Sequence, residues 1–80
     1  MARDEDVIGC TGVLVVGTRG DAGPGEVLVR VRGGSETLIA WSSEPLAPGA
    51  QVLVIDSRGA RQVDVIAWSD TEADPLDQLN

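Results

Sequence analysis

Histidine, lysine, tyrosine and phenylalanine are absent from this chain of 80 residues, and cysteine occurs once. Histidine, lysine, tyrosine and cysteine supply many of the side chains used in general acid–base and nucleophilic catalysis, so few candidate catalytic residues are present. Cys10 has no second cysteine with which to form an internal disulfide, and no Cys/His cluster is present to hold zinc. We therefore expect no enzymatic activity, no cofactor and no metal site.

Long apolar runs are also missing. No stretch reaches the roughly 18–20 apolar residues that a membrane-spanning helix needs. The acidic start of the chain, residues 3–6, is unlike the positively charged start of a signal peptide. A single cysteine is typical of a reducing compartment. We expect a soluble cytoplasmic chain without direct membrane insertion.

The net charge of −7 is concentrated at the two ends of the chain. Residues 1–6 and 70–80 hold seven acidic side chains against one arginine, so the body, residues 7–69, is nearly neutral. Binding to nucleic-acid phosphates requires clustered basic residues, which argues against such a partner. The end segments combine low hydrophobicity with high charge, and the sequence predicts that both are disordered.

The residues that are present favour strands. Val is the commonest apolar residue, and the β-branched side chains of Val and Ile suit a pleated surface. Turn signals recur at short, regular intervals, which is typical of an all-β barrel or sandwich. Five apolar runs lie between them, and the sequence predicts strands over residues 7–18, 26–32, 35–42, 51–56 and 61–68.

The connections between these runs indicate how the strands are joined. Gly33 and Gly34 are suited to a two-residue hairpin turn between the second and third strands, and a second turn is expected at residues 57–60. The connection at residues 43–49 contains two prolines, so it is not expected to hold a helix. Closure would remove exposed sheet edges. We predict an all-β, five-stranded OB-like barrel over residues 7–69, without the helix that usually follows the third strand.

In the order of these features the chain resembles the soluble C-terminal domain of the NfeD-like family. The motifs that carry the resemblance are Ile8-Gly9-x-x-Gly12, Gly25-x-Val27-x-Val29, Pro45-Leu46-x-Pro48-Gly49-x-x-Val52 and Val63-x-Val65-x-Ala67. The resemblance implies a helix-less OB-like barrel that acts as a protein-interaction module. In that family the barrel is usually attached to transmembrane helices and associated with flotillin/stomatin-type membrane-scaffold proteins. Here only six residues, four of them charged, precede the barrel, so the chain is either an excised domain of a longer membrane protein or a free-standing cytoplasmic form. We favour the free-standing form, recruited to the inner face of the cell membrane through a partner.

The candidate interaction residues are Leu28, Arg30, Arg32, Trp41 and Trp68. The first three share the face of the second strand opposite its valines, and the two tryptophans close the third and fifth strands. Each tryptophan is either a plug at a barrel end or an exposed anchor of the kind enriched at interfaces.

Arg30 and Arg32 also have two interpretations. They either form a solvated face with cross-strand ion pairs to Glu36 or Asp64, or belong to a patch that receives an acidic or apolar segment of a partner. We predict a non-catalytic protein–protein interaction module, associated with a membrane-scaffold or membrane-remodelling assembly. The alternative is a nucleic-acid-binding OB domain, for which Trp41 is the one aromatic side chain placed to stack on bases.

Overall fold

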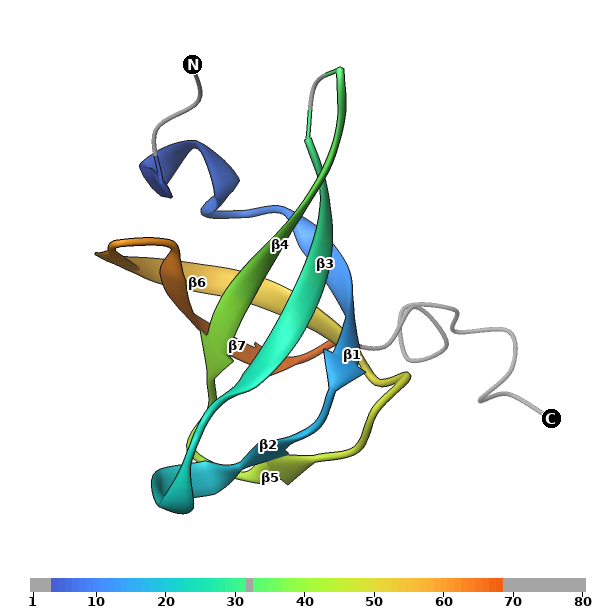
Figure 1. Cartoon of the computed structure of the whole chain (residues 1–80), viewed down its shortest axis with the longest axis vertical. Coiled ribbons are helices and arrows are strands. Elements are labelled where there is room, and N and C mark those ends of the chain that lie inside the picture. The colour runs from blue at the N-terminus through green and yellow to red at the C-terminus, as the bar shows by residue number, and fades with distance from the viewer. Residues whose placement is uncertain (1–3, 32, 69–80) are drawn as a thin grey trace, which may run out of the picture.

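The computed structural model describes residues 4–31 and 33–68 (Figure 1). Within these residues no helix has the length and apolar character needed to cross a bilayer. The elements, in chain order, are η1 (Asp4–Val7), β1 (Thr11–Val16), β2 (Thr18–Arg19), η2 (Gly20–Ala22), β3 (Gly25–Val31), β4 (Gly34–Trp41), β5 (Pro45–Leu46), β6 (Gln51–Gly59) and β7 (Gln62–Ala67); η denotes a 3₁₀ turn.

Five of these strands close into a barrel in the order β1-β3-β4-β7-β6, with β6 returning to β1. Neighbouring strands are antiparallel, except that β4 and β7 are parallel. This is the Greek-key arrangement of an OB-type barrel. The connection from β4 to β6 contains no helix, as its two prolines predicted. The predicted all-β, five-stranded, helix-less barrel is confirmed.

Alternating side chains of each strand fill the barrel. In β3, Val27 and Val29 are buried whereas Leu28 and Arg30 are exposed, as the period of two predicted. Valine dominates the interior because its stiff side chain packs well on a pleated sheet. The buried apolar residues of the described part are Val7, Leu14, Val27, Val29, Leu38, Ala40, Val52, Val54, Val63 and Val65.

The segment 7–18 is not the single bent strand that the sequence predicted. Its start belongs to η1, Gly9 has a φ of +92°, and β1 begins only at Thr11. The Gly9 amide donates to the Val54 carbonyl oxygen (2.8 Å), which holds this segment against β6. Val7 is only 1% exposed and packs in the core, so η1 contributes an apolar side chain to the barrel instead of extending β1.

Two glycines let β1 and β3 cross closely. A Cβ atom at Gly12 would lie 2.6 Å from the Leu28 carbonyl oxygen and 2.8 Å from a methyl group of Val27. A Cβ atom at Gly25 would collide with the carbonyl oxygens of Val16 and Gly17. Glycine is therefore required at both positions because a side chain would not fit, and not because the backbone needs the conformational freedom of glycine. The two glycines allow β1 and β3 to lie close together here.

The end of the predicted first strand forms a separate two-stranded sheet, in which β2 pairs with β5. Thr18 of β2 is buried, and its hydroxyl accepts a hydrogen bond from the Leu46 amide (2.9 Å) and lies 2.6 Å from the Ser42 hydroxyl. The Ser42 hydroxyl in turn donates to the Glu44 carbonyl oxygen (2.6 Å). The proline-rich connection is thus fixed to the barrel by side-chain hydrogen bonds, which the sequence pattern did not predict.

Both hairpin turns differ from their predicted positions by one or more residues. Gly34 pairs with Val31 and belongs to β4, so it does not lie in the turn. The turn predicted at residues 57–60 is also misplaced, because β6 continues to Gly59 and pairs there with Gln62. Residues 60 and 61 both have positive φ, as a tight primed turn requires of its two central residues.

The domain boundaries predicted at the two ends stay predictions, since residues 1–3 and 69–80 lie outside the described part of the chain.

Candidate functional site

Three of the five candidate residues line one shallow groove on the outside of the barrel. Leu28 and Arg30 come from β3, and Trp68 follows directly after β7. The groove has a volume of about 240 Å³. Its other lining residues are Thr11, Gly12, Val13 and Gln51.

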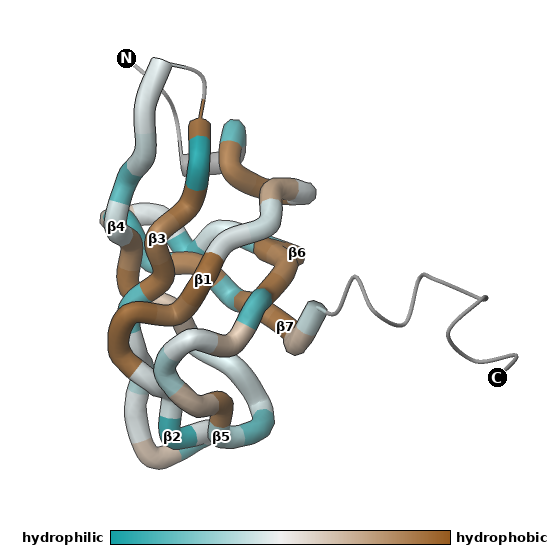
Figure 2. Tube along the Cα trace, turned by 90° about the vertical axis from the view of Figure 1, so that its right-hand side faces the viewer, coloured by the Kyte–Doolittle hydropathy of each residue, from teal (hydrophilic) through white to brown (hydrophobic). Residues whose placement is uncertain are grey.

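The barrel register explains why residues so far apart in the sequence meet here. Leu28 lies directly opposite Val13, and Val13 lies opposite Gln51 on the other side of β1. The Trp68 amide donates to the Gln51 carbonyl oxygen (2.8 Å), which fixes the tryptophan backbone beside β6. Figure 2 looks onto β1 with β3 on one side and β6 on the other, and apolar stretches recur along these neighbouring strands. The groove therefore crosses the strands and does not follow any one of them.

The groove is mainly apolar, with a single charged side chain among its lining residues. Leu28 is 40% exposed and Trp68 is 39% exposed, and Val13 between them is also exposed. The next pair on the same outer surface, Leu53 and Ile66, lies opposite one another on β6 and β7, and Ile66 is exposed too. Clustered exposed apolar side chains on a small soluble domain mark a contact surface more often than isolated ones do.

Sequence reasoning missed Val13 and Gln51 as members of this groove. The signal for Val13 was present, because it is the neighbour of the buried Leu14 and therefore faces outward on a strand. Gln51 offered no such signal, since its position depends on the pairing of β6 with β1.

Arg32, the fourth candidate, lies outside the described residues. Within the described residues Arg30 forms neither of the ion pairs predicted for it, and Glu36 and Asp64 have other partners, whereas the pairs predicted for Arg32 stay predictions. Glu36 faces Arg61 across 3.9 Å, and Asp64 pairs with Arg58.

Trp41, the fifth candidate, lies apart from the groove, at the end of β4 next to β7. Its indole N–H donates to the Gln62 side-chain oxygen (2.9 Å), and the Arg58 guanidinium lies 4.7 Å from the ring centroid, a cation–π contact. Trp41 is only half-buried and Trp68 is exposed, so neither belongs to the core. Their exposure favours the interpretation as surface anchors over that as barrel plugs.

Arg58 is held by two partners at once. Its Nε donates to Oδ1 and Oδ2 of Asp64 (3.1 and 3.2 Å), and its Nη2 donates to Oδ1 (2.8 Å). These hydrogen bonds raise the pKa of Arg58 above its ordinary value, so the guanidinium stays charged. Since this cation covers one face of Trp41, that face is not open for a stacking base, which weakens the case for a nucleic-acid platform.

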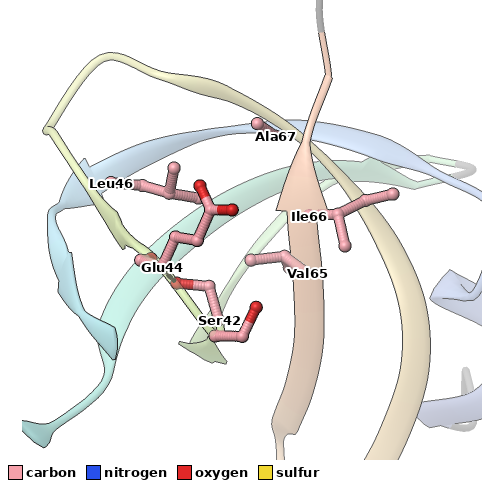
Figure 3. Close-up of a pocket in the computed structure, with 7 residues that line it drawn as sticks. Ser42, Glu44, Leu46, Val65, Ile66 and Ala67 are labelled. Carbon is pink, nitrogen blue, oxygen red and sulfur yellow. Dashed lines mark hydrogen bonds between the residues drawn. The ribbon is translucent and has the colours of Figure 1, made fainter. Parts of the chain in front are cut away.

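A second, smaller hollow of about 100 Å³ lies between the β5 region and β7 (Figure 3). Glu44 and Leu46 border one side, and Val65 and Ile66 border the other. None of the five candidate residues lines it. The described residues also contain no group of three or more His, Cys, Asp or Glu side chains placed to hold a metal ion.

Comparisons with known proteins agree with this architecture. Residues 11–66 match the family model of the NfeD C-terminal domain. The solved structure of the soluble domain of the NfeD protein YuaF from Bacillus subtilis is similar, with a TM-score of 0.69 and 28% sequence identity over 79% of this chain and 75% of that chain. A search of curated proteins found no match.

Proposed function

Because the chain belongs to the NfeD family through its C-terminal domain, we propose that it is a non-catalytic protein–protein interaction module. In this proposal it acts as an adaptor in a membrane-scaffold assembly, and its partner is a flotillin/stomatin-type or other membrane-associated protein. The contact surface is the groove lined by Leu28, Arg30 and Trp68.

One observation carries this proposal. Three residues from two distant segments of the chain, chosen from the sequence as interaction candidates, line a single exposed and largely apolar groove. Leucine and tryptophan beside one arginine provide large apolar area together with a charged hydrogen-bond donor, which is a common composition for the centre of a protein interface.

The carboxylates of the barrel support a non-catalytic role. Asp64 is engaged by Arg58 and Glu36 faces Arg61, and neither lies in the groove. Asp21 and Asp64 do border a common depression beside Trp41, but Asp64 is held there by three hydrogen bonds from Arg58, which leaves it poorly placed for the acid–base role that hydrolysis by two carboxylates needs.

In this proposal the module works in the cytoplasm and reaches the inner face of the membrane through its partner. The nearly neutral body gives no basic patch for anionic lipid, which favours a protein contact over direct lipid binding by the barrel.

Binding to a purified flotillin/stomatin-type protein from the same organism tests the proposal. We expect Leu28→Ser to weaken binding by at least about fivefold in a calorimetric titration, because truncating an apolar anchor at an interface costs more than about 1 kcal/mol. Ile39→Ser is the matched control, since Ile39 is 39% exposed but lies on β4 outside the groove. Equal effects of the two substitutions, or no binding by the unchanged chain, would contradict the proposal.

The nucleic-acid alternative is tested in parallel with single-stranded oligonucleotides at low salt. We expect no binding, and a salt-dependent interaction there would favour the alternative over the adaptor role.

A further inference from the structure

The groove presents its side chains in a fixed order across four neighbouring strands. Leu28 on β3 lies opposite Val13 on β1, and Val13 lies opposite Gln51 on β6. Trp68, at the end of β7, is tied to Gln51 through its backbone amide. Arg30 lies two residues from Leu28 on the same face of β3, so the arginine and the tryptophan are at opposite ends of this row.

Arg30 differs from Arg58 and Arg61, whose guanidinium groups have acidic partners. Arg58 pairs with Asp64, and Arg61 faces Glu36 and donates to the Thr37 carbonyl oxygen. The Arg19 guanidinium lies against Gly23 and, within the described residues, has no salt bridge either, but it lies outside the groove. Arg30 is exposed, and within the described part of the chain it forms neither a salt bridge nor a hydrogen bond through its side chain.

No carboxylate lines the groove, so an uncommitted positive charge lies at one end of an otherwise uncharged surface. The positive charge of Arg30 is complementary to an anionic group on a partner. The hollow continues past Arg30 toward the β3–β4 hairpin, where Leu28 and Arg30 also border a wide depression with Val31, Gly34 and Ser35. A bound segment can therefore extend beyond the arginine without meeting the barrel wall.

The strand spacing sets the separation of the two ends. Neighbouring strands lie about 4.8 Å apart, so the three steps from β3 through β1 and β6 to β7 amount to roughly 14 Å along the barrel wall, and Arg30 lies two residues, about 6.6 Å, further along β3 than Leu28. Together these steps give roughly 16 Å along the wall, and the straight distance is somewhat shorter because the wall is curved. An extended peptide advances about 3.3 Å per residue, so this span corresponds to about four residues.

From these observations we propose that the groove binds an extended segment of a partner protein with a defined spacing. A large apolar side chain contacts Trp68 and Val13, and a carboxylate about four residues away pairs with Arg30. The inference rests on the proposed function, and it adds the chemistry and spacing of the recognised segment.

Short synthetic peptides test this inference with the full chain. The probe is a serine/glycine peptide that carries one isoleucine and one glutamate four positions apart, titrated into the ¹⁵N-labelled chain and followed by NMR. We expect shifts of the amides that line the groove, in particular Val13, Gln51 and Trp68. A peptide with glutamine in place of glutamate should bind roughly fivefold more weakly, which is the upper range for an exposed ion pair.

Two variants test whether Arg30 is the residue that pairs with the glutamate of the peptide. Arg30→Gln should remove the difference between the glutamate and glutamine peptides, because the pairing group is gone. Arg19→Gln removes the same charge on β2, outside the groove, and should leave the difference intact. Equal affinity of the two peptides for the unchanged chain, or a difference that survives Arg30→Gln, would overturn the inference. So would a concentration-dependent dimer, detected by sedimentation, whose formation shifts the same amides, because a second copy would then occupy the groove.

The two proposals can fail separately. If the membrane-associated partner binds through Leu28 but the peptides show no preference for the carboxylate, the spacing rule is wrong and the adaptor role stands. If the peptides show the preference and the partner does not bind, the groove recognises another class of protein and the adaptor role fails.

Discussion

The buried hydroxyl of Thr18 shows how one polar side chain organises a connection. It lies at the junction of β2, β5 and the residues after β4, and it is only 4% exposed. Its oxygen accepts from the Leu46 amide and lies next to the Ser42 hydroxyl, so several polar groups depend on it. A buried polar group that loses its partner costs more than a hydrogen bond contributes.

We therefore expect Thr18→Val to destabilise the fold by about 1–3 kcal/mol, because the Leu46 amide would keep its burial and lose its acceptor. Urea unfolding followed by circular dichroism measures this change. Thr37→Val is the control, since Thr37 is exposed on β4 and should change the free energy of unfolding by less than about 0.5 kcal/mol. An equal effect of both variants would show that the hydroxyl network does not hold the connection.

Gly12 is a second single residue on which the packing depends. Gly12→Ala would place a methyl group 2.6 Å from the Leu28 carbonyl oxygen, and β1 and β3 would have to separate. We expect a loss of about 1–3 kcal/mol in the free energy of unfolding, as for other overpacked sites. Gly34→Ala is the matched variant, because nothing lies within 4 Å of a Cβ atom there and its φ is not positive. The prediction fails if Gly12→Ala is as well tolerated as Gly34→Ala.

At the scale of elements, the β6–β7 turn is the strained part of the barrel. Ala60 and Arg61 both adopt left-handed backbone conformations, with φ of +55° and +61°. For residues with a Cβ atom this conformation costs roughly 1–2 kcal/mol each. Tight pairing of Gly59 with Gln62 leaves room for two residues only, and this forces the conformation.

Replacing Ala60 with asparagine should relieve part of this strain, because asparagine tolerates the left-handed region. We expect Ala60→Asn to increase the free energy of unfolding by roughly 0.5–1 kcal/mol, measured by chemical denaturation. Ala47→Asn is the comparison, since Ala47 is an exposed alanine without positive φ. A gain of the same size at position 47, or none at position 60, would show that the turn stores no recoverable strain.

The elements also show what the sequence could and could not predict. The alternation of Val27 and Val29 with Leu28 and Arg30 predicted β3 and its two faces, because each strand carries this information locally. The strand ends were less predictable. Gly33 and Gly34 are equally suited to a turn, and only the pairing of Val31 with Gly34 decides between them.

The groove could be predicted in part for the same reason. The sequence indicates which residues of β3 face outward and that Trp68 is apolar. It does not indicate that Gln51 joins them in the groove, because that depends on the register between β6 and β1, which lie far apart in the chain. The prediction of a strand beginning at Val7 was wrong. Val7 and Ile8 form a short apolar pair before Gly9, and such a pair has no periodic signal to distinguish a strand from a turn that packs into a barrel end.

At the scale of the whole molecule, the barrel and the acidic ends contribute differently. The body carries almost no net charge, while the two ends hold most of the −7. Packing of Val7 shows that the barrel depends on residues just before β1. In contrast, the family match ends at residue 66, close to the end of β7 at Ala67.

We therefore expect the two ends to differ in their effect on stability. Val7→Ala should lower the free energy of unfolding by about 2 kcal/mol, because two buried methyl groups are lost and a cavity remains. Val15→Ala is the control, since Val15 is exposed.

A chain shortened after residue 69 should unfold with the same midpoint as the full chain, measured by thermal denaturation. A large loss on shortening would show that the acidic end packs on the barrel.

The separation of the two tryptophans gives the molecule its own optical reporters. Trp41 lies beside Arg58 on the β4–β7 side, Trp68 lies in the groove, and the chain has no tyrosine whose emission could overlap theirs. A chain that retains only Trp68 would report occupancy of the groove through its fluorescence alone, without any attached dye. A chain that retains only Trp41 would report on a surface outside the groove, so parallel measurements on the two chains would distinguish ligand binding from general unfolding.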